Sequence, residues 1–421
     1  MSKDCKSTTC TEYLDKSIAI GDIRQDPYPV YSVLRRDDPL CWSEHWGCWV
    51  VSRHSDITML FKDTQHTSNA GRVVHAIKNS YPVEDRKRLQ PLIDHYSHGL
   101  INVDPPDHTR LRRLVQKAFT PRTLERIQPR IDEIVRELLD QAASKTNFEL
   151  IHDFAYLLPV TVIAELLGIP PEMHAQFKSW SQGIVAFMAT PRPDVDIALS
   201  SQKALMELCD YFRQVFAERR KEPRADLISD LVNVHLGNDS LTEKELLSTC
   251  VTMLIGGHET TTTLLASAMH LIVTAPELAS DLKRDSELMP SAVEEFLRYE
   301  PPFQRILRIV REPIELHGTT LQPGDIVMML LGAANRDPDV FLDPDTFDPR
   351  RSPNRHLSFG HGAHFCLGAA MARIEAPIAL NRILERFPDV SLAGDSVTWN
   401  DGMIRCLAAL PLDLNLVVAT E

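Results

Sequence analysis

The stretch Phe359-Gly360-His361-Gly362-Ala363-His364-Phe365-Cys366-Leu367-Gly368 places a cysteine behind two closely spaced glycines, at the start of a helix predicted over 367–387. Glycines allow tight turns that a Cβ would block. The N-terminus of a helix presents free N–H groups and the positive end of the helix dipole, which together favour a thiolate over a thiol. Cys366 is therefore a candidate nucleophile or metal ligand, and the ordinary alternative is a buried loop cysteine.

A second unusual stretch is a long helix predicted over 242–275, which begins with the capping-box pattern Thr242-Glu243-Lys244-Glu245. It would contain about 34 residues and be roughly 50 Å long. Between Leu246 and Ala275, Glu259 is the only Asp, Glu, Lys or Arg residue. A membrane span has this length, but many Ser and Thr residues interrupt the apolar run. We therefore expect a helix buried through the middle of a soluble protein.

The composition is that of a soluble globular protein, because 43% of the 421 residues are hydrophobic and 24% are charged. The net charge of −13 argues against nucleic-acid binding, which needs a cationic surface. The eight cysteines form no C-x-x-C pair and are too sparse for a disulfide framework. The N-terminus carries no apolar stretch of signal-peptide length. These features predict a cytoplasmic protein with reduced thiols.

Helical patterns dominate the chain, and no linker divides it. We expect a polar, flexible N-terminus over 1–25 and a single, mainly α (α+β) domain over 26–421 with a small β portion. Residues 66–103 show no clean period and are expected to be irregular, with one or two short helices. The other predicted helices cover 124–145, 149–167, 172–189, 199–220 and 225–234, one more starts after Asp104, and strands are predicted at 46–51, 305–317, 325–331 and near the C-terminus.

The cysteine stretch resembles the haem-thiolate loop of the cytochrome P450 family at every fixed position of Phe-Gly-x-Gly-x-His-x-Cys-x-Gly. Three more segments resemble that family in the expected order: its oxygen-binding stretch at 256–261, its E-x-x-R pair at 295–298 and its meander at 347–350. The helix after Asp104 is similar to the family's haem-propionate helix. The resemblance covers most of the chain and points to the soluble bacterial branch. It implies the cytochrome P450 fold, haem b (iron protoporphyrin IX) as cofactor, a monomer and no membrane association.

The resemblance assigns the haem contacts to particular residues. Cys366 would be the axial thiolate, the metal ligand of the haem iron. His108 and Arg112 lie four apart on one helix face and, with Arg308 and His364, would hold the anionic propionates. Each of these cations, taken alone, could be an ordinary surface charge.

Glu295 and Arg298 carry the E-x-x-R resemblance, which implies a buried structural pair that supports folding and haem retention. Taken alone, two residues three apart could be a surface ion pair of little worth.

Glu259 and Thr260 are the catalytic candidates. A carboxylate within an apolar helix is costly unless it has a partner or a task. The resemblance implies an acid–alcohol pair that relays protons during O₂ activation, with Gly256 leaving room beside the helix for O₂. The ordinary alternative is a kinked helix with a satisfied threonine. Because both residues are present, the sequence favours a monooxygenase that uses O₂ and two electrons over a peroxide-driven relative.

The electrons must come from a separate protein, because the chain carries no flavin- or nicotinamide-binding motif. Arg110, Arg113 and Lys117 form a basic group on the helix that starts near 107. We expect this group to dock a ferredoxin or flavodoxin, which works with its reductase, and the ordinary alternative is a solvated helix face.

The substrate is the least determined feature. The resemblance places Phe187, Gly256, Phe303, Ile306 and Met403 along an apolar lining, although each could equally be core packing. An apolar small molecule fits, either a free secondary metabolite, a polyketide-type intermediate or a carrier-bound acyl group, and hydroxylation or epoxidation is the expected reaction. Oxidative coupling, desaturation or nitration on the same haem remains an alternative, as does a haem-based binding or sensor protein.

Overall fold

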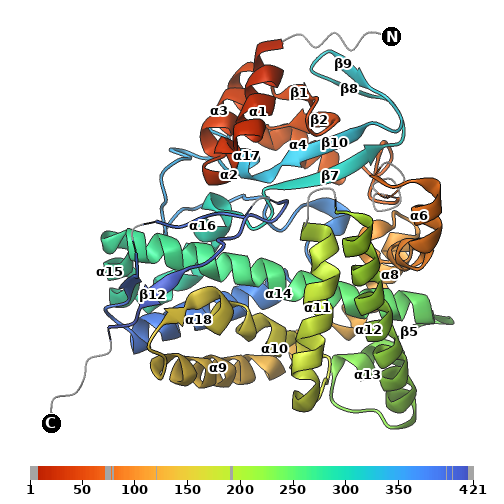
Figure 1. Cartoon of the computed structure of the whole chain (residues 1–421), viewed down its shortest axis with the longest axis vertical. Coiled ribbons are helices and arrows are strands. Elements are labelled where there is room, and N and C mark those ends of the chain that lie inside the picture. The colour runs from red at the N-terminus through yellow and green to blue at the C-terminus, as the bar shows by residue number, and fades with distance from the viewer. Residues whose placement is uncertain are drawn as a thin grey trace. The chain divides into compact units, whose positions relative to one another are not determined.

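The computed structural model describes residues 8–71, 77, 80–119, 121–189, 193–394, 396–400 and 402–415. Helices make up most of this part of the chain (Figure 1). The α-helices are α1 (Thr8–Ile20), α2 (Asp22–Gln25), α3 (Tyr28–Asp37), α4 (His54–Lys62), α6 (Val83–Arg88), α7 (Gln90–Tyr96), α8 (Asp107–Ala118), α9 (Pro121–Ala143), α10 (Leu157–Leu166), α11 (His174–Ala189), α12 (Val195–Lys221), α13 (Leu227–Val232), α14 (Glu243–Thr274), α15 (Pro276–Arg284), α16 (Met289–Tyr299), α17 (Leu331–Ala334) and α18 (Ala369–Arg386).

Short helical turns and short strands connect these helices. The helical turns are η1 (Leu100–Asn102), η2 (Ile151–Ala155), η3 (Pro171–Met173), η4 (Ser286–Leu288) and η5 (Gly362–His364). The strands are β1 (Leu40–Ser43), β2 (Cys48–Val51), β3 (Thr67–Ser68), β4 (Phe148–Glu149), β5 (His235–Leu236), β6 (Asp239–Ser240), β7 (Arg305–Val310), β8 (Ile314–Leu316), β9 (Thr319–Leu321), β10 (Ile326–Leu330), β11 (Ser391–Leu392) and β12 (Pro411–Asp413).

The chain divides into two compact units, each built from separate pieces of sequence. Unit 1 consists of Met1–Asn69, Thr263–Cys366 and Phe387–Glu421, and unit 2 of Ala70–Thr262 and Leu367–Arg386.

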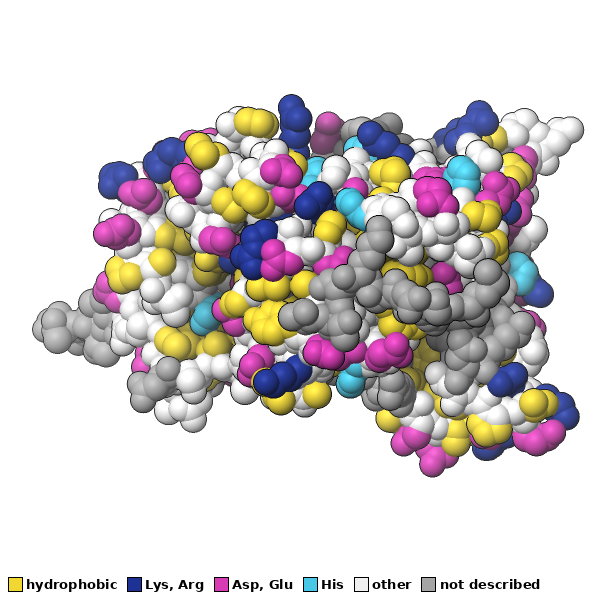
Figure 2. All heavy atoms as spheres, turned by 90° about the horizontal axis from the view of Figure 1, so that it is seen from above, with side chains coloured by type: hydrophobic (Ala, Val, Ile, Leu, Met, Phe, Trp, Pro, Cys, Tyr) yellow, Lys and Arg dark blue, Asp and Glu magenta, His cyan; other side chains and the backbone are white. Residues whose placement is uncertain are grey.

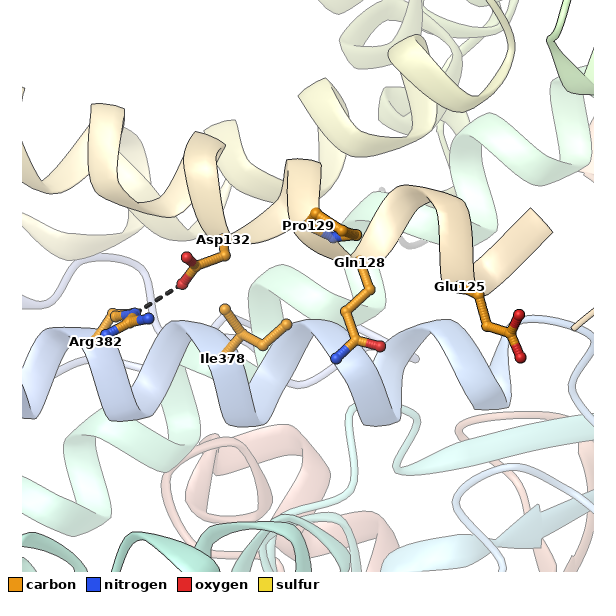
Figure 3. A pocket seen from close by; sticks show the side chains of 6 residues that line it. All are labelled: Glu125, Gln128, Pro129, Asp132, Ile378 and Arg382. Atoms are coloured by element: carbon orange, nitrogen blue, oxygen red, sulfur yellow. Dashed lines mark hydrogen bonds and ion pairs between the residues drawn. The ribbon is translucent and has the colours of Figure 1, made fainter. Parts of the chain in front are cut away.

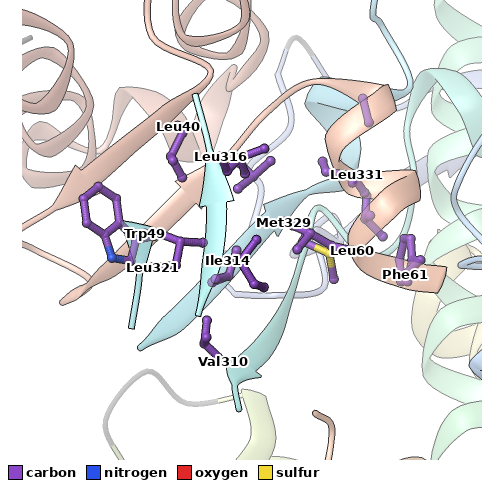
Figure 4. Packing of buried hydrophobic residues seen from close by; sticks show 14 of the residues in the cluster. Leu40, Trp49, Leu60, Phe61, Val310, Ile314, Leu316, Leu321, Met329 and Leu331 are labelled. Atoms are coloured by element: carbon purple, nitrogen blue, oxygen red, sulfur yellow. The ribbon is translucent and has the colours of Figure 1, made fainter. Parts of the chain in front are cut away.

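Unit 1 is organised around a five-stranded sheet with the order β1-β2-β10-β7-β3. Strand β10 pairs parallel with β2 and antiparallel with β7. Alternate residues of β10 enter two different apolar clusters, since Val327 and Met329 lie in one while Met328 and Leu330 lie in the other. Figure 4 shows the first cluster, in which Met329 lies near Ile314 and Leu60. Strand β10 is therefore apolar on both faces, which explains its continuous hydrophobic sequence.

The N-terminal part of unit 1 differs from the flexible segment expected over 1–25. Helices α1 and α2 cover most of it, and Cys10 and Leu14 are buried in the second apolar cluster. These two residues are four apart and so share one helix face. The Asp15 carboxylate also accepts hydrogen bonds from the Ser43 hydroxyl (2.6 Å) and the Glu44 backbone N–H (2.9 Å). Few apolar residues therefore suffice to hold this polar helix on unit 1.

Unit 2 is a set of packed helices. Helix α11 packs closely on α12, because a Cβ added at Gly183 would lie 2.8 Å from the Cβ of Ala204. In the range 66–103 the described residues form β3, α6, α7 and η1, so the short helices expected there are present. Residues 72–76, 78 and 79 of that range lie outside the described residues.

The helix predicted over 149–167 is interrupted, because η2 precedes α10 and is a wider, π-type turn. Pro159 lacks an N–H, so the carbonyl of Ala155 cannot receive its ordinary helical hydrogen bond. The Thr262 hydroxyl lies 3.1 Å from that carbonyl oxygen and 2.9 Å from the His258 carbonyl oxygen, and shares its single proton between these two acceptors. A side chain from a distant helix thus satisfies the backbone group that the proline leaves unpaired, and this partner is not readable from local sequence.

Helix α14 confirms the long helix predicted over 242–275. Its capping box is formed, because the Thr242 N–H donates to the Glu245 carboxylate at 2.8 Å and the Glu245 N–H donates to the Thr242 hydroxyl at 3.4 Å. Within the described part of the chain, no single helix is long and apolar enough to cross a membrane. Among the described helices, only α14 and α15 taken together have the length and composition of a membrane span. The two helices meet at a bend of 106°.

Candidate active site

The cysteine loop of unit 1 is a fixed turn that presents a thiol. Gly360 and Gly362 both have φ of 70°, and a Cβ at Gly362 would lie 2.8 Å from the carbonyl oxygen of Phe61. The Cys366 N–H donates to the Phe359 carbonyl at 2.8 Å, which closes the loop. Cys366 is exposed, whereas each of the other described cysteines is buried or half-buried. The geometry therefore suits a thiolate ligand better than the buried loop cysteine that was the ordinary alternative.

An arginine and a histidine of unit 1 accompany this thiol in the predicted haem set. Arg308 lies in β7, is 1% exposed and has its guanidinium carbon 5.9 Å from the centre of the Phe61 ring. His364 is half-buried in η5, within the cysteine loop itself. A buried guanidinium is costly unless it serves an anion, and its planar donors match a carboxylate such as a propionate.

The other two predicted propionate ligands belong to unit 2. His108 lies in the first turn of α8 and is 2% exposed, while Arg112 is half-buried one turn further on. Taken unit by unit, the predicted ligands have the chemistry that an anionic iron porphyrin requires: a thiol, an arginine and a histidine in unit 1, and an arginine and a histidine in unit 2.

The stretch predicted to bind oxygen, residues 256–261, lies in the part of α14 that belongs to unit 2. Gly256 is exposed, and a Cβ added there would meet nothing within 4 Å. The hydroxyl of Thr260 donates to the Gly256 carbonyl at 2.9 Å, and the Thr261 and Thr262 hydroxyls donate to the carbonyls four residues before them at 3.2 and 2.9 Å. Threonines that bond the preceding turn loosen the helical ladder. The helix therefore offers free space at Gly256 and a hydroxyl beside it.

Glu259 is held by a polar group that sequence reasoning missed. Its Oε1 lies 3.1 Å from Nε2 of His258, and Ser181 Oγ of α11 lies 3.1 Å from the same nitrogen. The Glu259 side chain is 25% exposed, while His258 is fully buried. A histidine beside the only acidic residue between Leu246 and Ala275 is a sequence signal for such a pair, but nothing local indicates that Ser181 completes it.

The E-x-x-R pair of unit 1 is fully buried. Arg298 and Glu295 form a two-point ion pair with distances of 2.7 and 2.8 Å, and both side chains are 0% exposed. The remaining Arg298 donors reach the carbonyls of three residues, and Glu295 accepts from three more donors. These contacts are to Asn335, Pro344 and Thr346 on one side and to Asp348, Arg351 and Asn354 on the other. The pair thus holds the meander around 347–350 by its backbone.

The basic group of α8 is less uniformly cationic than its sequence indicates. Arg110 is ion-paired with Asp239 at 3.1 Å and also with Glu245. Lys117 donates to the backbone carbonyl of His235 at 2.6 Å, which leaves its charge in place, and Arg113 is exposed. Residues Pro105, Pro106, Thr109, Arg110, Arg113, Leu236, Gly237 and Asp239 line a hollow of about 800 Å³ beside this helix.

The predicted substrate-lining residues are distributed over both units. In unit 1, the Gln304 N–H donates to the Met403 carbonyl at 3.0 Å and Phe303 pairs with Ile404, so Phe303, Ile306 and Met403 come from neighbouring segments. Phe187, in α11, and Gly256 belong to unit 2. Phe187, Phe303, Ile306 and Met403 are half-buried, which suits a lining more than a core.

Two further surface features lie outside the predicted site. A hollow of about 480 Å³ lies between α9 and α18, where Arg382 donates to Asp132 at 2.7 Å (Figure 3). On the face of the molecule in Figure 2, acidic and basic side chains are interspersed and neither sign forms a broad patch.

A thiol on a glycine turn, cationic side chains and an acid–alcohol helix are the parts of a haem-thiolate protein, and comparison with known proteins identifies the family. The cytochrome P450 family model matches residues 57–399. The biotin biosynthesis cytochrome P450 of Bacillus subtilis (strain 168) is 38% identical, with 90% of this chain and 93% of the relative covered. The mycinamicin IV hydroxylase/epoxidase of Micromonospora griseorubida is 40% identical, with 88% and 89% covered.

The fold of this chain is also similar to solved structures of cytochrome P450 proteins. The crystal structure of P450BioI in complex with an acyl carrier protein ligated to hexadec-9Z-enoic acid has a TM-score of 0.85 and 36% identity, and 93% of this chain and 99% of that chain are covered. The chain therefore belongs to the cytochrome P450 family, and the predicted fold class is confirmed. It is a monooxygenase whose cofactor is haem, and its fold implies O₂ and a redox partner.

Proposed function

We propose that this chain binds haem b through the thiolate of Cys366 and oxidises an apolar small molecule with O₂ and two electrons. Haem held by a thiolate supplies the binding and reductive activation of O₂. The observation that carries the proposal is the helix segment in which Thr260 donates to the Gly256 carbonyl beside Glu259, next to open space at Gly256. A catalyst of O₂ reduction needs such a proton-handling group, whereas a haem protein that only binds ligands does not.

In this proposal the chain's own residues have separate tasks. His108, Arg112, Arg308 and His364 hold the propionates as charge-assisted donors. Thr260 positions a proton donor beside the space at Gly256, and Glu259, being 25% exposed, exchanges protons with solvent. Glu295 and Arg298 keep the meander in place and thereby retain the haem.

We further propose that residues 26–421 act as one catalytic domain in a monomeric, cytoplasmic protein without membrane or nucleic-acid partners. Neither compact unit is a continuous segment of sequence, which supports one domain. Electrons would come from a ferredoxin or flavodoxin and its reductase, docking near Arg110, Arg113 and Lys117. Because Arg110 is ion-paired with Asp239 and Glu245, most of the attraction would come from Arg113 and Lys117.

For the substrate, we propose a hydrophobic secondary metabolite or polyketide-type intermediate that is hydroxylated or epoxidised. The half-buried apolar residues Phe187, Phe303, Ile306 and Met403 support an apolar ligand. One relative is a hydroxylase/epoxidase of mycinamicin IV, and one structural neighbour holds an acyl carrier protein. The substrate is therefore sought both free and attached to a carrier protein, by screening for a shift of the haem Soret band.

Replacing Cys366 by Ser tests the proposed ligand. The ferrous carbonyl complex of the wild-type protein should have the red-shifted Soret band of haem-thiolate proteins, and the variant should lose it. Cys406→Ser is the matched control, because Cys406 is also partly accessible and lies in unit 1 but outside the loop. Retention of the band in Cys366→Ser would show that another residue ligates the iron.

A further inference from the structure

The buried ring of His258 has one nitrogen whose protonation is dictated by its partner. Nδ1 lies 2.7 Å from the carbonyl oxygen of Leu254, one turn earlier in α14. A carbonyl oxygen only accepts hydrogen bonds, so Nδ1 carries a proton. In a neutral ring the other nitrogen, Nε2, then has a lone pair.

The contact between His258 Nε2 and the Glu259 carboxylate requires a second proton, in addition to the one on Nδ1. Nε2 lies 3.1 Å from Glu259 Oε1, and a lone pair facing an ionised carboxylate at hydrogen-bond distance is repulsive. A proton therefore lies between the two atoms, either on Nε2, opposite a carboxylate, or on Oε1, opposite a neutral ring. In both forms the pair is neutral overall and holds one transferable proton. Ser181 Oγ, 3.1 Å from Nε2, accommodates both forms because a hydroxyl donates or accepts.

An aromatic ring and a cationic side chain lie beside the pair. Tyr156 packs edge-on against the His258 ring with ring centres 5.3 Å apart. Burial, and then the nearby charge of Glu259, raises the pKa of Tyr156 above its usual range, so it stays a neutral phenol. Lys178 of α11 lies with its Nζ 4.8 Å from the centre of the Tyr156 ring. Among the described residues, the titratable or charged groups seen beside His258 and the ring packed on it include Glu259, Tyr156 and Lys178.

We propose that His258 is a positioning residue that shares one proton with Glu259 and thereby stores it beside Thr260. The proposal rests on the proposed function of the Glu259–Thr260 segment. When Glu259 gives up the shared proton toward the Thr260 side, the pair becomes anionic, and a proton from solvent at the exposed part of Glu259 restores it. No electron transfer is involved, and Ser181 holds the ring in the orientation that this exchange needs.

The first test locates the proton directly in the haem-loaded ferrous carbonyl protein, which is diamagnetic. Ring nitrogen resonances of ¹⁵N-histidine protein, assigned by their loss in His258→Asn, report the protonation of Nδ1 and Nε2. Infrared difference spectra between wild type and Glu259→Gln report whether the Glu259 carboxyl is protonated. We expect a protonated Nδ1 and, at neutral pH, either a protonated Nε2 or a protonated carboxyl. A bare Nε2 together with an ionised carboxylate would overturn the proposal, as would a bare Nδ1.

The second test measures the consequence in turnover. His258→Gln keeps an N–H for Ser181 but cannot exchange a proton, so product formed per reducing equivalent should fall about tenfold, less than the hundredfold or more typical of losing a general acid. The solvent isotope effect and the pH profile of coupling should change, while the ferrous carbonyl band and the substrate-induced Soret shift stay. His270→Gln, which alters a histidine of the same helix packed on Trp399, is the control and should leave coupling unchanged. Unchanged coupling, isotope effect and pH profile in His258→Gln would contradict the inference.

These outcomes separate the inference from the proposed function. If Thr260→Ala uncouples turnover but no shared proton is found, only the role of His258 is wrong. If Cys366→Ser keeps the haem-thiolate spectrum, the proposed function itself fails, whatever the state of His258.

Discussion

Two acidic residues of this chain sit in helices beside a cationic or titratable neighbour, yet their surroundings are opposite. Glu295 is 0% exposed and accepts hydrogen bonds from Arg298, Asp348, Arg351 and Asn354. Glu259 is 25% exposed, and its partner is the His258 imidazole, whose Nε2 donates or accepts a hydrogen bond depending on its protonation, whereas the Arg298 guanidinium only donates. The Glu295 carboxylate, whose hydrogen bonds are all made within the protein, serves the fold, whereas the partly exposed Glu259 beside His258 is the one proposed to move a proton.

The largest effect is expected from breaking the saturated pair. Arg298→Ala leaves the Glu295 carboxylate buried without its main partner, which costs about 3–5 kcal/mol of unfolding free energy. Denaturant unfolding and haem content measure the loss. Arg350→Ala is the control, because Arg350 is exposed and its side chain, among the described residues, forms a 3.4 Å ion pair with Asp281 that is worth about 1 kcal/mol or less. If both variants lost the same small amount, the buried pair would not be what holds the meander.

The next effect concerns the segment proposed to move protons. Thr260→Ala removes the hydroxyl without blocking electron entry, so reducing equivalents should still be consumed while product per equivalent falls about tenfold or more and hydrogen peroxide appears. Glu259→Gln should slow the whole cycle, because proton supply itself is lost. Thr261→Ala, in which the neighbouring hydroxyl on the same helix is removed, serves as the control. Full coupling in Thr260→Ala would remove the basis of the proposed relay.

A third acidic residue, Glu375 of α18, differs from both. It is neither surrounded by hydrogen-bond donors, as Glu295 is, nor partly exposed, as Glu259 is. It is 2% exposed, its Oε2 has no hydrogen-bond partner among the described residues, and burial raises its pKa to about 8. The folded state therefore favours the protonated form. As the pH rises from about 4.5 to about 8, the unfolded chain gains stability by ionising this group, and folding stability falls over that window.

Glu375→Gln tests this pH dependence. The amide is neutral at every pH and has a similar shape, so the variant should match wild type near pH 4.5 and exceed its unfolding free energy near pH 8. Unfolding curves at several pH values provide the measurement. Parallel stability–pH curves for the two proteins would mean that Glu375 is ionised in the folded state.

The smallest effect is expected at the exposed basic group. Arg113→Glu and Lys117→Glu should each slow reduction by the partner protein roughly twofold to fivefold at low ionic strength, with a weaker salt dependence. Substrate affinity should not change. Arg136→Glu, a charge reversal at an exposed residue of α9 outside this group, is the control. Equal reduction rates in all variants would leave the group as an ordinary solvated face.

Much of this protein is readable from sequence because its signals are local. Gly360 and Gly362 both have φ of 70°, a backbone conformation that favours glycine. The capping box predicted at Thr242 is formed, with both of its hydrogen bonds present. The apolar run of α14 and the three-residue spacing of Glu295 and Arg298 follow from helix geometry. Such features depend on residues within one or two helical turns. Their sequence pattern therefore predicts them without knowledge of how the rest of the chain packs.

Other features were decided only by tertiary structure, because their partners are far apart in sequence. Ser181 meets His258 across 77 positions, and Thr262 reaches the carbonyl that Pro159 leaves unpaired in a different helix. Arg110 appears cationic in sequence, but Asp239 and Glu245 compensate its charge in the fold. Hydrogen bonds and ion pairs act over a few ångströms, so which side chains they join depends on how the helices pack, and the motifs of this chain do not record that packing.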